Sequence, residues 1–270
     1  MHEIVRLALE EDIGTGDVTS IACVPKARMA QGRFLAREPL TLAGTGLLRE
    51  IYDYLGLVDE LNILKQDGER CEDGDIVATV RGRARTLLNG ERVALNFLQR
   101  LSGVATAARH YADAVRGTNC KVLDTRKTTP GLRLLEKAAA AAGGVTNHRI
   151  GLFDAILIKN NHISAAGGVG NALQQARECG LPIEIEVRTR AELREALDSG
   201  ATHLLLDNLT PAEAADWIRE IDGRAKVELS GGITLQNVRD YALAGADYVS
   251  SGAITHSARA MDLSFRLELA

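Results

Sequence analysis

Basic side chains are concentrated between residues 124 and 159, in a chain whose formal net charge is −4. This stretch holds six Lys or Arg residues against three Asp or Glu residues. Arg126, Lys127 and Lys159 lie at or beside the ends of short apolar runs, where strands are expected to end. An Arg guanidinium binds a carboxylate or phosphate through two parallel hydrogen bonds, and Lys offers a compact positive charge. The pattern predicts a site for a small ligand that carries several negative charges.

Four further residues of this stretch are candidates for the same site. Arg133 and Lys137 lie on a predicted helix, where surface ion pairs explain them equally well. His148 and Arg149 follow Gly143-Gly144 in a predicted loop. An isolated histidine is usually structural, but the adjacent Arg149 makes His148 a candidate contact of the anion.

Two Ser-Gly segments follow the last two predicted strands, Ser230-Gly231-Gly232 and Ser251-Gly252-Ala253. Small residues let backbone N–H groups approach a phosphate, and the N-terminus of a following helix favours an anion. In α/β barrels the loops after the last two strands often bind phosphate. We therefore expect Ser230, Gly231 and Gly252 to bind a terminal phosphate. Tight turns that need positive φ are the alternative.

Three carboxylates stand at predicted strand ends. Glu184 and Glu186 alternate with apolar residues, so both point to the same face of one strand, and Asp207 ends the next. Buried acids need partners. Glu186 and Asp207 are expected to bind ribose hydroxyls or Mg²⁺, or to stabilise a developing cation. Glu184 lies deeper and fits equally well as a buried partner of Lys159 or Lys127.

These residues require a scaffold in which strands and helices alternate. Six short apolar runs are predicted strands: Lys121–Asp124, Ala155–Lys159, Ile183–Val187, His203–Asp207, Lys226–Ser230 and Tyr248–Ser251. Ala-rich helical patterns lie between most of them: Ala166–Glu178, Arg190–Asp198, Pro211–Ile221 and Leu235–Ala244. The alternation predicts a parallel sheet. It is too short for a complete eight-stranded barrel, so the sheet is either doubly wound or an incomplete barrel.

Polar residues at the strand ends favour the barrel. A barrel gathers the carboxyl ends of its strands in one ring, whereas a doubly wound sheet spreads them along a line. Nearly every predicted strand ends in such a residue: Asp124, Lys159, Glu186, Asp207, Ser230 and Ser251.

The first part of the chain reads differently. Residues 1–85 mix short helical and strand-like stretches with turn signals, and Ile76–Val80 is a predicted strand. From Thr86 to about Val115, apolar residues recur at three- and four-residue spacing. This pattern predicts a helix with a break at Ser102-Gly103.

Composition excludes several classes of protein. A hydrophobic fraction of 46% and a charged fraction of 25% are ordinary for a globular protein, and a net charge of −4 gives no reason to expect nucleic acid. No apolar run is long enough to span a membrane, and the acidic start does not resemble a signal peptide. The scattered cysteines predict reduced, mostly buried thiols in a cytoplasmic protein. They are Cys23, Cys71, Cys120 and Cys179.

The ordered motifs resemble those of the quinolinate phosphoribosyltransferases, also called decarboxylating nicotinate-nucleotide pyrophosphorylases. The resemblance spans nearly the whole chain. Its motifs are Glu10–Thr19, Gly90–Leu98, Leu101–Thr106, Asp124–Thr128, Pro130–Arg133, Asn147–Arg149, Ile158–His162, Glu184–Val187, Leu206–Asn208 and Glu228–Gly232. Departures are minor: Asn160 stands where many members carry an acid, and Leu229 where Ala is common.

The resemblance implies an enzyme of NAD biosynthesis. Quinolinate attacks C1 of 5-phosphoribosyl-1-pyrophosphate through its ring nitrogen, pyrophosphate leaves, and the 2-carboxylate is lost as CO₂. The product is nicotinate mononucleotide, and Mg²⁺ is required.

The resemblance also implies a role for each site residue. The dicarboxylate pocket is expected to comprise Thr125, Arg126, His148, Arg149 and Lys159, joined by Arg92 from a neighbouring subunit. Lys127 is expected to face the phosphates of the sugar donor. Glu186 and Asp207 are expected to hold the ribose and Mg²⁺, and with Lys127 and Lys159 to form the catalytic set. The 5-phosphate falls to Ser230, Gly231 and Gly252.

The implied architecture is an N-terminal α/β sandwich domain followed by an incomplete parallel α/β barrel of about six strands. The first domain is expected at residues 1–105, joined by residues 261–270, and the barrel at 106–260. Two subunits of a homodimer are expected to share each site, and the sequence leaves further assembly open.

Three other readings remain open at this point. A molybdenum-associated homologue with another substrate would not need all of Arg92, Arg126, His148 and Arg149. A Schiff-base aldolase would use Lys127 or Lys159 as nucleophile, and borohydride trapping would detect it. A phosphosugar-binding regulator would need an effector domain, which the sequence does not indicate.

Overall fold

The computed structural model describes residues 3–56 and 58–269. The chain divides into two compact units. The first unit comprises the residues up to Arg109, Thr129–Gly144 and the residues from Ala258 onward. The second unit comprises His110–Thr128 and Val145–Ser257.

The first unit is built on an antiparallel sheet with the strand order β12-β1-β5-β3. Its strands are β1 (Met29–Ala36), β3 (Glu60–Ile63), β5 (Ile76–Arg83) and β12 (Leu263–Leu269). Residues of β1 alternate between buried and half-buried, as expected for a strand with one covered face. A small second sheet pairs β2 (Leu40–Thr41) with β4 (Arg70–Cys71).

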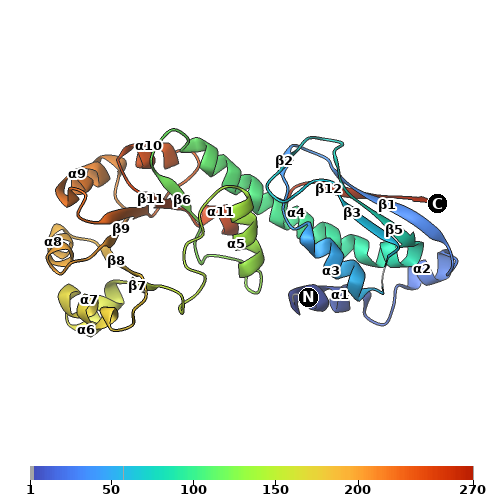
Figure 1. The fold of residues 1–270 in the computed structure, drawn as a ribbon, viewed down its shortest axis with the longest axis horizontal. Helices are drawn as coiled ribbons and strands as arrows, with labels where there is room; N and C mark the ends of the chain where they lie inside the picture. The colour runs from blue at the N-terminus through green and yellow to red at the C-terminus, as the bar shows by residue number, and fades with distance from the viewer. Residues whose placement is uncertain (1–2, 57, 270) are drawn as a thin grey trace. The chain divides into compact units, whose positions relative to one another are not determined.

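Helices cover one side of this sheet (Figure 1). They are α1 (Glu3–Ile13), α3 (Gly46–Tyr54) and α4 (Ala84–Ala114). The same unit also contains α2 (Val18–Cys23) and α5 (Arg133–Ala142), and α5 lies apart from the sheet. The helix predicted from about residue 86 is therefore confirmed. Its predicted break is wrong, because α4 runs through Ser102 and Gly103 without interruption.

Close packing explains these two residues of α4. A Cβ at position 103 would lie 1.9 Å from the carbonyl oxygen of Arg259, so only glycine fits there. The Ser102 hydroxyl accepts the backbone N–H of Ala43 at 3.1 Å. Small residues here bring other segments of the first unit against the helix.

The second unit is a six-stranded parallel sheet with the order β6-β11-β10-β9-β8-β7. Within this unit, the last strand, β11, pairs with the first, β6. The sheet therefore curls toward closure and remains open between β6 and β7. A single bridge between Leu123 and Thr146 lies beside β6 at this opening. The strands are β6 (Lys121–Leu123), β7 (Ile156–Ile158), β8 (Ile183–Val187), β9 (His203–Asp207), β10 (Lys226–Ser230) and β11 (Tyr248–Ser250).

Helices lie outside these strands (Figure 1). They are α6 (Asn160–Ala166), α7 (Val169–Arg177), α8 (Arg190–Asp198), α9 (Pro211–Ile221), α10 (Val238–Leu243) and α11 (Ala253–His256). All six predicted strands and the four predicted helices are present. The strand order confirms the incomplete barrel over the doubly wound sheet.

The structure tests the expectations about the cysteines and about membrane-spanning segments. All four cysteines are free, but only Cys71 and Cys120 are buried, whereas Cys23 and Cys179 are exposed. The prediction of mostly buried thiols therefore holds for half of them. In residues 3–56 and 58–269, none of the helices combines the length and the apolar character that crossing a bilayer demands.

Candidate active site

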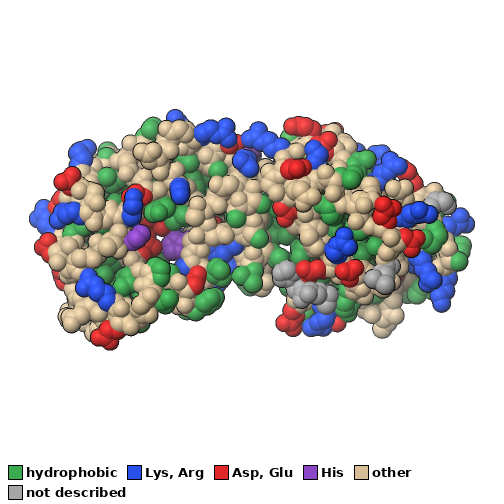
Figure 2. Space-filling view, viewed as in Figure 1, with side chains coloured by type: hydrophobic (Ala, Val, Ile, Leu, Met, Phe, Trp, Pro, Cys, Tyr) green, Lys and Arg blue, Asp and Glu red, His purple; other side chains and the backbone are tan. Residues whose placement is uncertain are grey.

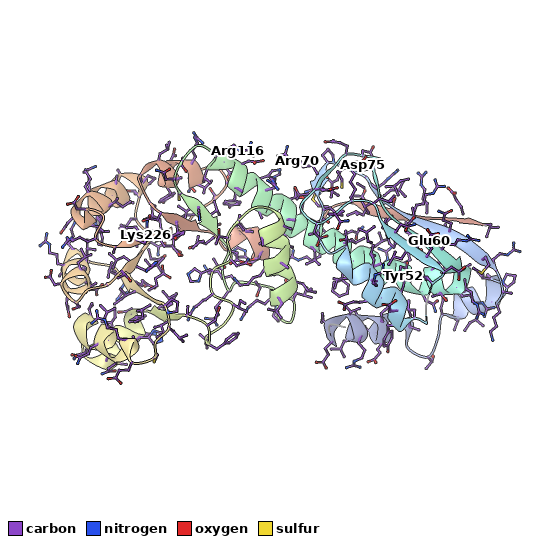
Figure 3. All side chains as sticks on the ribbon, viewed as in Figure 1. Tyr52, Glu60, Arg70, Asp75, Arg116 and Lys226 are labelled. Atoms are coloured by element: carbon purple, nitrogen blue, oxygen red, sulfur yellow. The ribbon has the colours of Figure 1, made fainter. Side chains whose placement is uncertain are left out.

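The carboxyl ends of the barrel strands surround a cavity of about 350 Å³. Figure 2 shows histidine, acidic and basic side chains over the middle of this unit, on the face where Figure 3 labels Lys226, the first residue of β10. Nine of the residues proposed from the sequence line the cavity: Thr125, Arg126, Lys127, His148, Arg149, Lys159, Glu186, Asp207 and Ser230. They come from five different strand ends and from the loop around residue 148.

Two guanidinium groups lie near each other in this cavity. Burial lowers the pKa of Arg149, and the positive charge of Arg126 lowers it further. The Arg149 Nη1 donates to the carbonyl oxygen of Ala155 at 3.0 Å, which orients its side chain. Like charges repel, so a pair of arginines brought together is best stabilised by a bound anion. The arrangement suits a ligand with carboxylates.

The segment after β6 is held from within the same unit. The Thr125 hydroxyl accepts the backbone N–H of Lys127 at 3.1 Å. The carbonyl oxygen of Lys127 accepts the hydroxyl of Thr255, on α11, at 2.8 Å. A Cβ at Gly252 would lie 2.8 Å from the Lys127 side chain, so Gly252 leaves room for that lysine. The Lys127 side chain is exposed at the cavity.

Glu186 and Asp207 line the cavity from the ends of neighbouring strands, β8 and β9. The Lys159 Nζ lies 3.7 Å from Glu186 Oε2. One oxygen of Asp207 accepts the side-chain amide of Asn208 at 2.6 Å. Mg²⁺ commonly takes one or two protein carboxylates and fills its shell with waters and substrate phosphates. Two oxygen-donor carboxylates on one wall of the cavity fit such an ion.

The Ser-Gly loops differ in how they contribute. Ser230 lines the cavity, whereas Gly231 and Gly252 lie beside it. Gly231 has a φ of +91°, and Gly232 has a φ of +62°. The hydroxyl of Ser251 is buried and donates to the carbonyl oxygen of Ile233 at 2.8 Å. The glycines of the first loop, Gly231 and Gly232, are therefore explained equally well by two readings. One is the need for positive φ, and the other is phosphate binding.

His148 forms a cluster with two glutamates. Its Nε2 lies 3.1 Å from Glu184 Oε2 and 3.4 Å from Glu228 Oε2. The expected pairing of Glu184 with Lys159 or Lys127 is therefore wrong. Leu157 lies opposite Glu184 in the β7–β8 register, and Glu184 reaches the histidine from inside the barrel.

The positions of the protons in this cluster follow from the pKa shifts and the hydrogen bonds of His148 and Glu184. Burial lowers the pKa of His148, but hydrogen bonds and charges from Glu184 and Glu228 outweigh burial and raise it to about 10. A ring protonated at both nitrogens conflicts with the 2.7 Å contact in which Nδ1 accepts the Arg149 backbone N–H. The contact decides, because a lone pair is required at Nδ1. The proton that Nδ1 does not carry is therefore held by the carboxylates. Burial, and then the negative charge of Glu228, raise the pKa of Glu184, which favours its protonated form.

Sequence reasoning missed four residues that line the cavity. These are Leu157, Leu205, Glu228 and Ser250. Leu205 and Glu228 lie two positions before Asp207 and Ser230 on the same strands. Leu157 lies two positions before Lys159, the residue that follows β7. Each of the three therefore shares the face of a predicted site residue. The alternation that linked Glu184 with Glu186 would have found these three if it had been applied to every strand.

Three basic residues considered from the sequence do not line this cavity. Arg92 is exposed on α4 in the first unit. Arg133 and Lys137 lie on α5, also in the first unit, and Lys137 is buried there. Surface ion pairing therefore does not account for Lys137.

An incomplete parallel barrel with a cationic cavity and two carboxylates at its strand ends defines an α/β-barrel enzyme for small anionic substrates. A family model described as quinolinate phosphoribosyl transferase, C-terminal domain, matches residues 104–266. The corresponding N-terminal domain model matches residues 17–102. The chain belongs to the quinolinate phosphoribosyltransferase family.

Individual relatives agree with this family. The chain is 39% identical to a probable nicotinate-nucleotide pyrophosphorylase [carboxylating] of Bacillus subtilis, over 96% of this chain and 90% of the relative. The structure of NadC from Streptococcus pyogenes has a TM-score of 0.93 and 38% identity, covering 99% of this chain and 96% of that one. A nicotinate-nucleotide pyrophosphorylase from Francisella tularensis has a TM-score of 0.95 and 35% identity, covering 99% and 95%.

Proposed function

We propose that the cavity at the carboxyl ends of the barrel strands is the active site of a quinolinate phosphoribosyltransferase. The enzyme transfers the phosphoribosyl group of 5-phosphoribosyl-1-pyrophosphate to quinolinate and releases pyrophosphate and CO₂. Nicotinate mononucleotide is the product, and the reaction serves NAD biosynthesis. The observation that carries the proposal is the convergence of Arg126, Arg149 and Lys159 in one cavity with Glu186 and Asp207. Family membership supports the same reaction.

Quinolinate belongs on the arginine side of the cavity. Its two carboxylates match the guanidinium groups of Arg126 and Arg149 and the ammonium of Lys159. Thr125 offers a hydroxyl beside them. Both ring nitrogens of His148 bond to groups of the chain. We therefore assign His148 to orienting its neighbours.

The sugar donor belongs on the opposite side. Lys127 faces its phosphates, and the 5-phosphate is bound by Ser230 with the backbone of Gly231 and Gly252. Glu186 and Asp207 hold the ribose and would bind Mg²⁺. Bound there, Mg²⁺ supplies positive charge that neutralises the pyrophosphate.

In the reaction the quinolinate nitrogen bonds to C1 of the ribose as the bond from C1 to pyrophosphate breaks. Positive charge develops on the ribose, and the fixed carboxylates of Glu186 and Asp207 stabilise it without reorganising. Lys127 and Lys159 stabilise the negative charge of the leaving group and of the dicarboxylate. CO₂ then leaves C2, and a proton takes its place.

Two subunits share each active site in this proposal. Arg92 is exposed and is not among the residues that line the cavity of the barrel unit. An exposed arginine on a helix can serve the quinolinate pocket of a second copy. The enzyme acts in the cytoplasm, as its four free cysteines favour a reducing compartment.

A two-substrate assay tests the reaction. Purified protein with Mg²⁺, quinolinate and the phosphoribosyl donor should release pyrophosphate and CO₂ in equal amounts, and EDTA should stop both until Mg²⁺ is restored. Lys127→Ala should be inactive. Lys226→Ala is the matched control, because Lys226, labelled in Figure 3, is the first residue of β10 and does not line the cavity. Release of neither product by the wild-type protein would rule out the proposal.

A further inference from the structure

His148, Glu184 and Glu228 form a nearly enclosed polar cluster, two of whose members, His148 and Glu228, line the cavity. The side chains of His148 and Glu184 are 16% and 15% exposed, and that of Glu228 is 6% exposed. Two carboxylates therefore converge on one imidazole nitrogen inside the barrel. Removing a carboxylate from water costs free energy, so buried acids need specific partners.

A divalent metal is one partner that this geometry admits. One ligand atom from each of the three residues lies within 4.8 Å of the others. A histidine that binds metal through Nε2 carries its proton on Nδ1 and donates it to a neighbour. Here Nδ1 accepts the backbone N–H of Arg149 at 2.7 Å instead. The ring proton therefore lies on Nε2 and is donated to the glutamates, which favours a hydrogen-bonded cluster over a metal site.

The same contact connects the cluster to the substrate pocket. The Arg149 N–H bonds to Nδ1 of the same ring whose Nε2 contacts the two glutamates. Asp124 is fully buried and accepts the backbone N–H of His148 at 2.7 Å. Its second oxygen accepts the side-chain amide of Asn147 at 2.7 Å. The backbone that carries Arg149 is thus fixed by buried carboxylates from β8, β10 and the end of β6.

We infer that Glu184 and Glu228 are positioning residues, which orient the His148 ring so that its Nδ1 fixes the backbone of Arg149. The inference rests on the proposed function, in which Arg149 binds a carboxylate of quinolinate. Neither glutamate touches substrate in this scheme. Their effect reaches quinolinate through Arg149 and leaves the sugar donor on the far side unaffected.

Kinetics with both substrates provide the test. Glu184→Leu and Glu228→Leu should each raise the KM for quinolinate by about tenfold, while the KM for the phosphoribosyl donor stays unchanged. Glu184→Gln and Glu228→Gln keep an acceptor oxygen and should recover most of the quinolinate affinity. His148→Asn places an oxygen near the position of Nδ1 and should retain more affinity than His148→Gln, which does not.

The matched control is Asp247→Leu. Asp247 bonds to Lys226 and to the backbone of Val227 at the amino end of β10, so its loss removes polar contacts outside the cavity lining. Both KM values should stay at the wild-type level. An equal rise in both KM values for the glutamate variants would show a general structural role and overturn the inference.

A second measurement needs neither variants nor activity. Nitrogen NMR of the histidine rings in the wild-type protein should show His148 protonated at Nε2 and unprotonated at Nδ1 at neutral pH. Protons on both nitrogens, or one equivalent of Zn²⁺ or Mn²⁺ bound through this ring, would overturn the inference. A wild-type protein with the expected spectrum but without activity would instead refute the proposed function.

Discussion

At the scale of single residues, Gly231 has the least freedom in the loop after β10. Its φ is +91°, and a Cβ there would lie 2.6 Å from the backbone nitrogen of Asn208. That nitrogen donates to the carbonyl oxygen of Ser230 at 2.9 Å, so it cannot move away without breaking this bond between the ends of β9 and β10. Gly231→Ala should therefore cost about 2 kcal/mol of unfolding free energy and raise the KM for the phosphoribosyl donor. Urea unfolding and steady-state kinetics measure the two effects.

Gly232→Ala is the control for this substitution. Its φ of +62° is also positive, but a Cβ there meets nothing within 4 Å. Only the backbone strain of a left-handed residue applies, which is about 1 kcal/mol. Equal losses at both glycines would show that crowding against Asn208 contributes nothing.

Tyr52 offers a prediction of the opposite sign. Its ring is fully buried on α3 (Figure 3), and its hydroxyl has no hydrogen-bond partner within the described residues. A buried hydroxyl without a partner costs free energy, whereas the ring itself packs well. Tyr52→Phe should raise the unfolding free energy by about 1 kcal/mol. Tyr111→Phe should lower it, because the Tyr111 hydroxyl lies 3.3 Å from the Ser251 hydroxyl oxygen and donates to it, the proton of Ser251 being donated to Ile233. A less stable Tyr52→Phe protein would contradict this account.

The residue types were more predictable than their partners. The charges at strand ends placed Arg126, Lys159 and Asp207 at one cavity, because parallel strands end on one side of a barrel. For Glu184 the sequence offered a lysine partner as one of two equal possibilities, and in the structure its partner is His148. The loop that brings His148 into the barrel has no periodic signal, so its path could not be read from the sequence.

At the scale of elements, the C-terminal strand β12 pairs with β1 and is also held at its start. Arg259 binds both oxygens of Glu38, at 2.8 and 2.5 Å, and the backbone N–H of Asp262 donates to Glu38 at 2.8 Å. The hydrogen bond from Arg259, and then that from Asp262, lower the pKa of Glu38 from 4.5 to about 2. The ionised carboxylate therefore stabilises the folded state.

Glu38→Gln tests this anchor through its pH dependence. A lowered folded pKa contributes stability above the unfolded pKa of 4.5, and that stability is lost as pH falls toward about 2. At neutral pH the variant should be less stable by under about 1 kcal/mol, since the Arg259 partner is largely exposed to solvent. The difference should shrink by about pH 3. A gap in urea unfolding that is the same at both pH values would exclude the charged interaction as its source.

Elements with strong periodic patterns were predicted well, and special packing was not. The predicted bounds of α8 and α9 match the structure, because caps and apolar spacing agree there. The Ser102-Gly103 pair looked like a helix break. Its cause is the carbonyl oxygen of Arg259, which lies far along the chain and would contact a Cβ at position 103. Local sequence contains no information about such a neighbour.

At the scale of the whole molecule, the proposed site needs residues from two subunits. Lys127 lines the cavity of the barrel unit, whereas Arg92 is exposed on α4 of the first unit. If each site takes its Arg92 from the other copy, Arg92→Ala and Lys127→Ala should each be inactive alone. In a mixed dimer, the Lys127→Ala chain supplies Arg92 to the intact Lys127 of its partner. One of the two sites is then complete.

Mixing the two inactive variants measures this arrangement directly. Random exchange at equal amounts makes half of the dimers mixed, so about one quarter of the wild-type sites should be active. Subunit exchange is checked with differently tagged chains, and Lys226→Ala mixed with Lys127→Ala shows the activity expected when one partner is fully competent. If subunit exchange is complete and the mixture remains inactive, Arg92 acts within its own chain. In that outcome both residues of each site come from one subunit, and the shared site is refuted while the reaction itself stands.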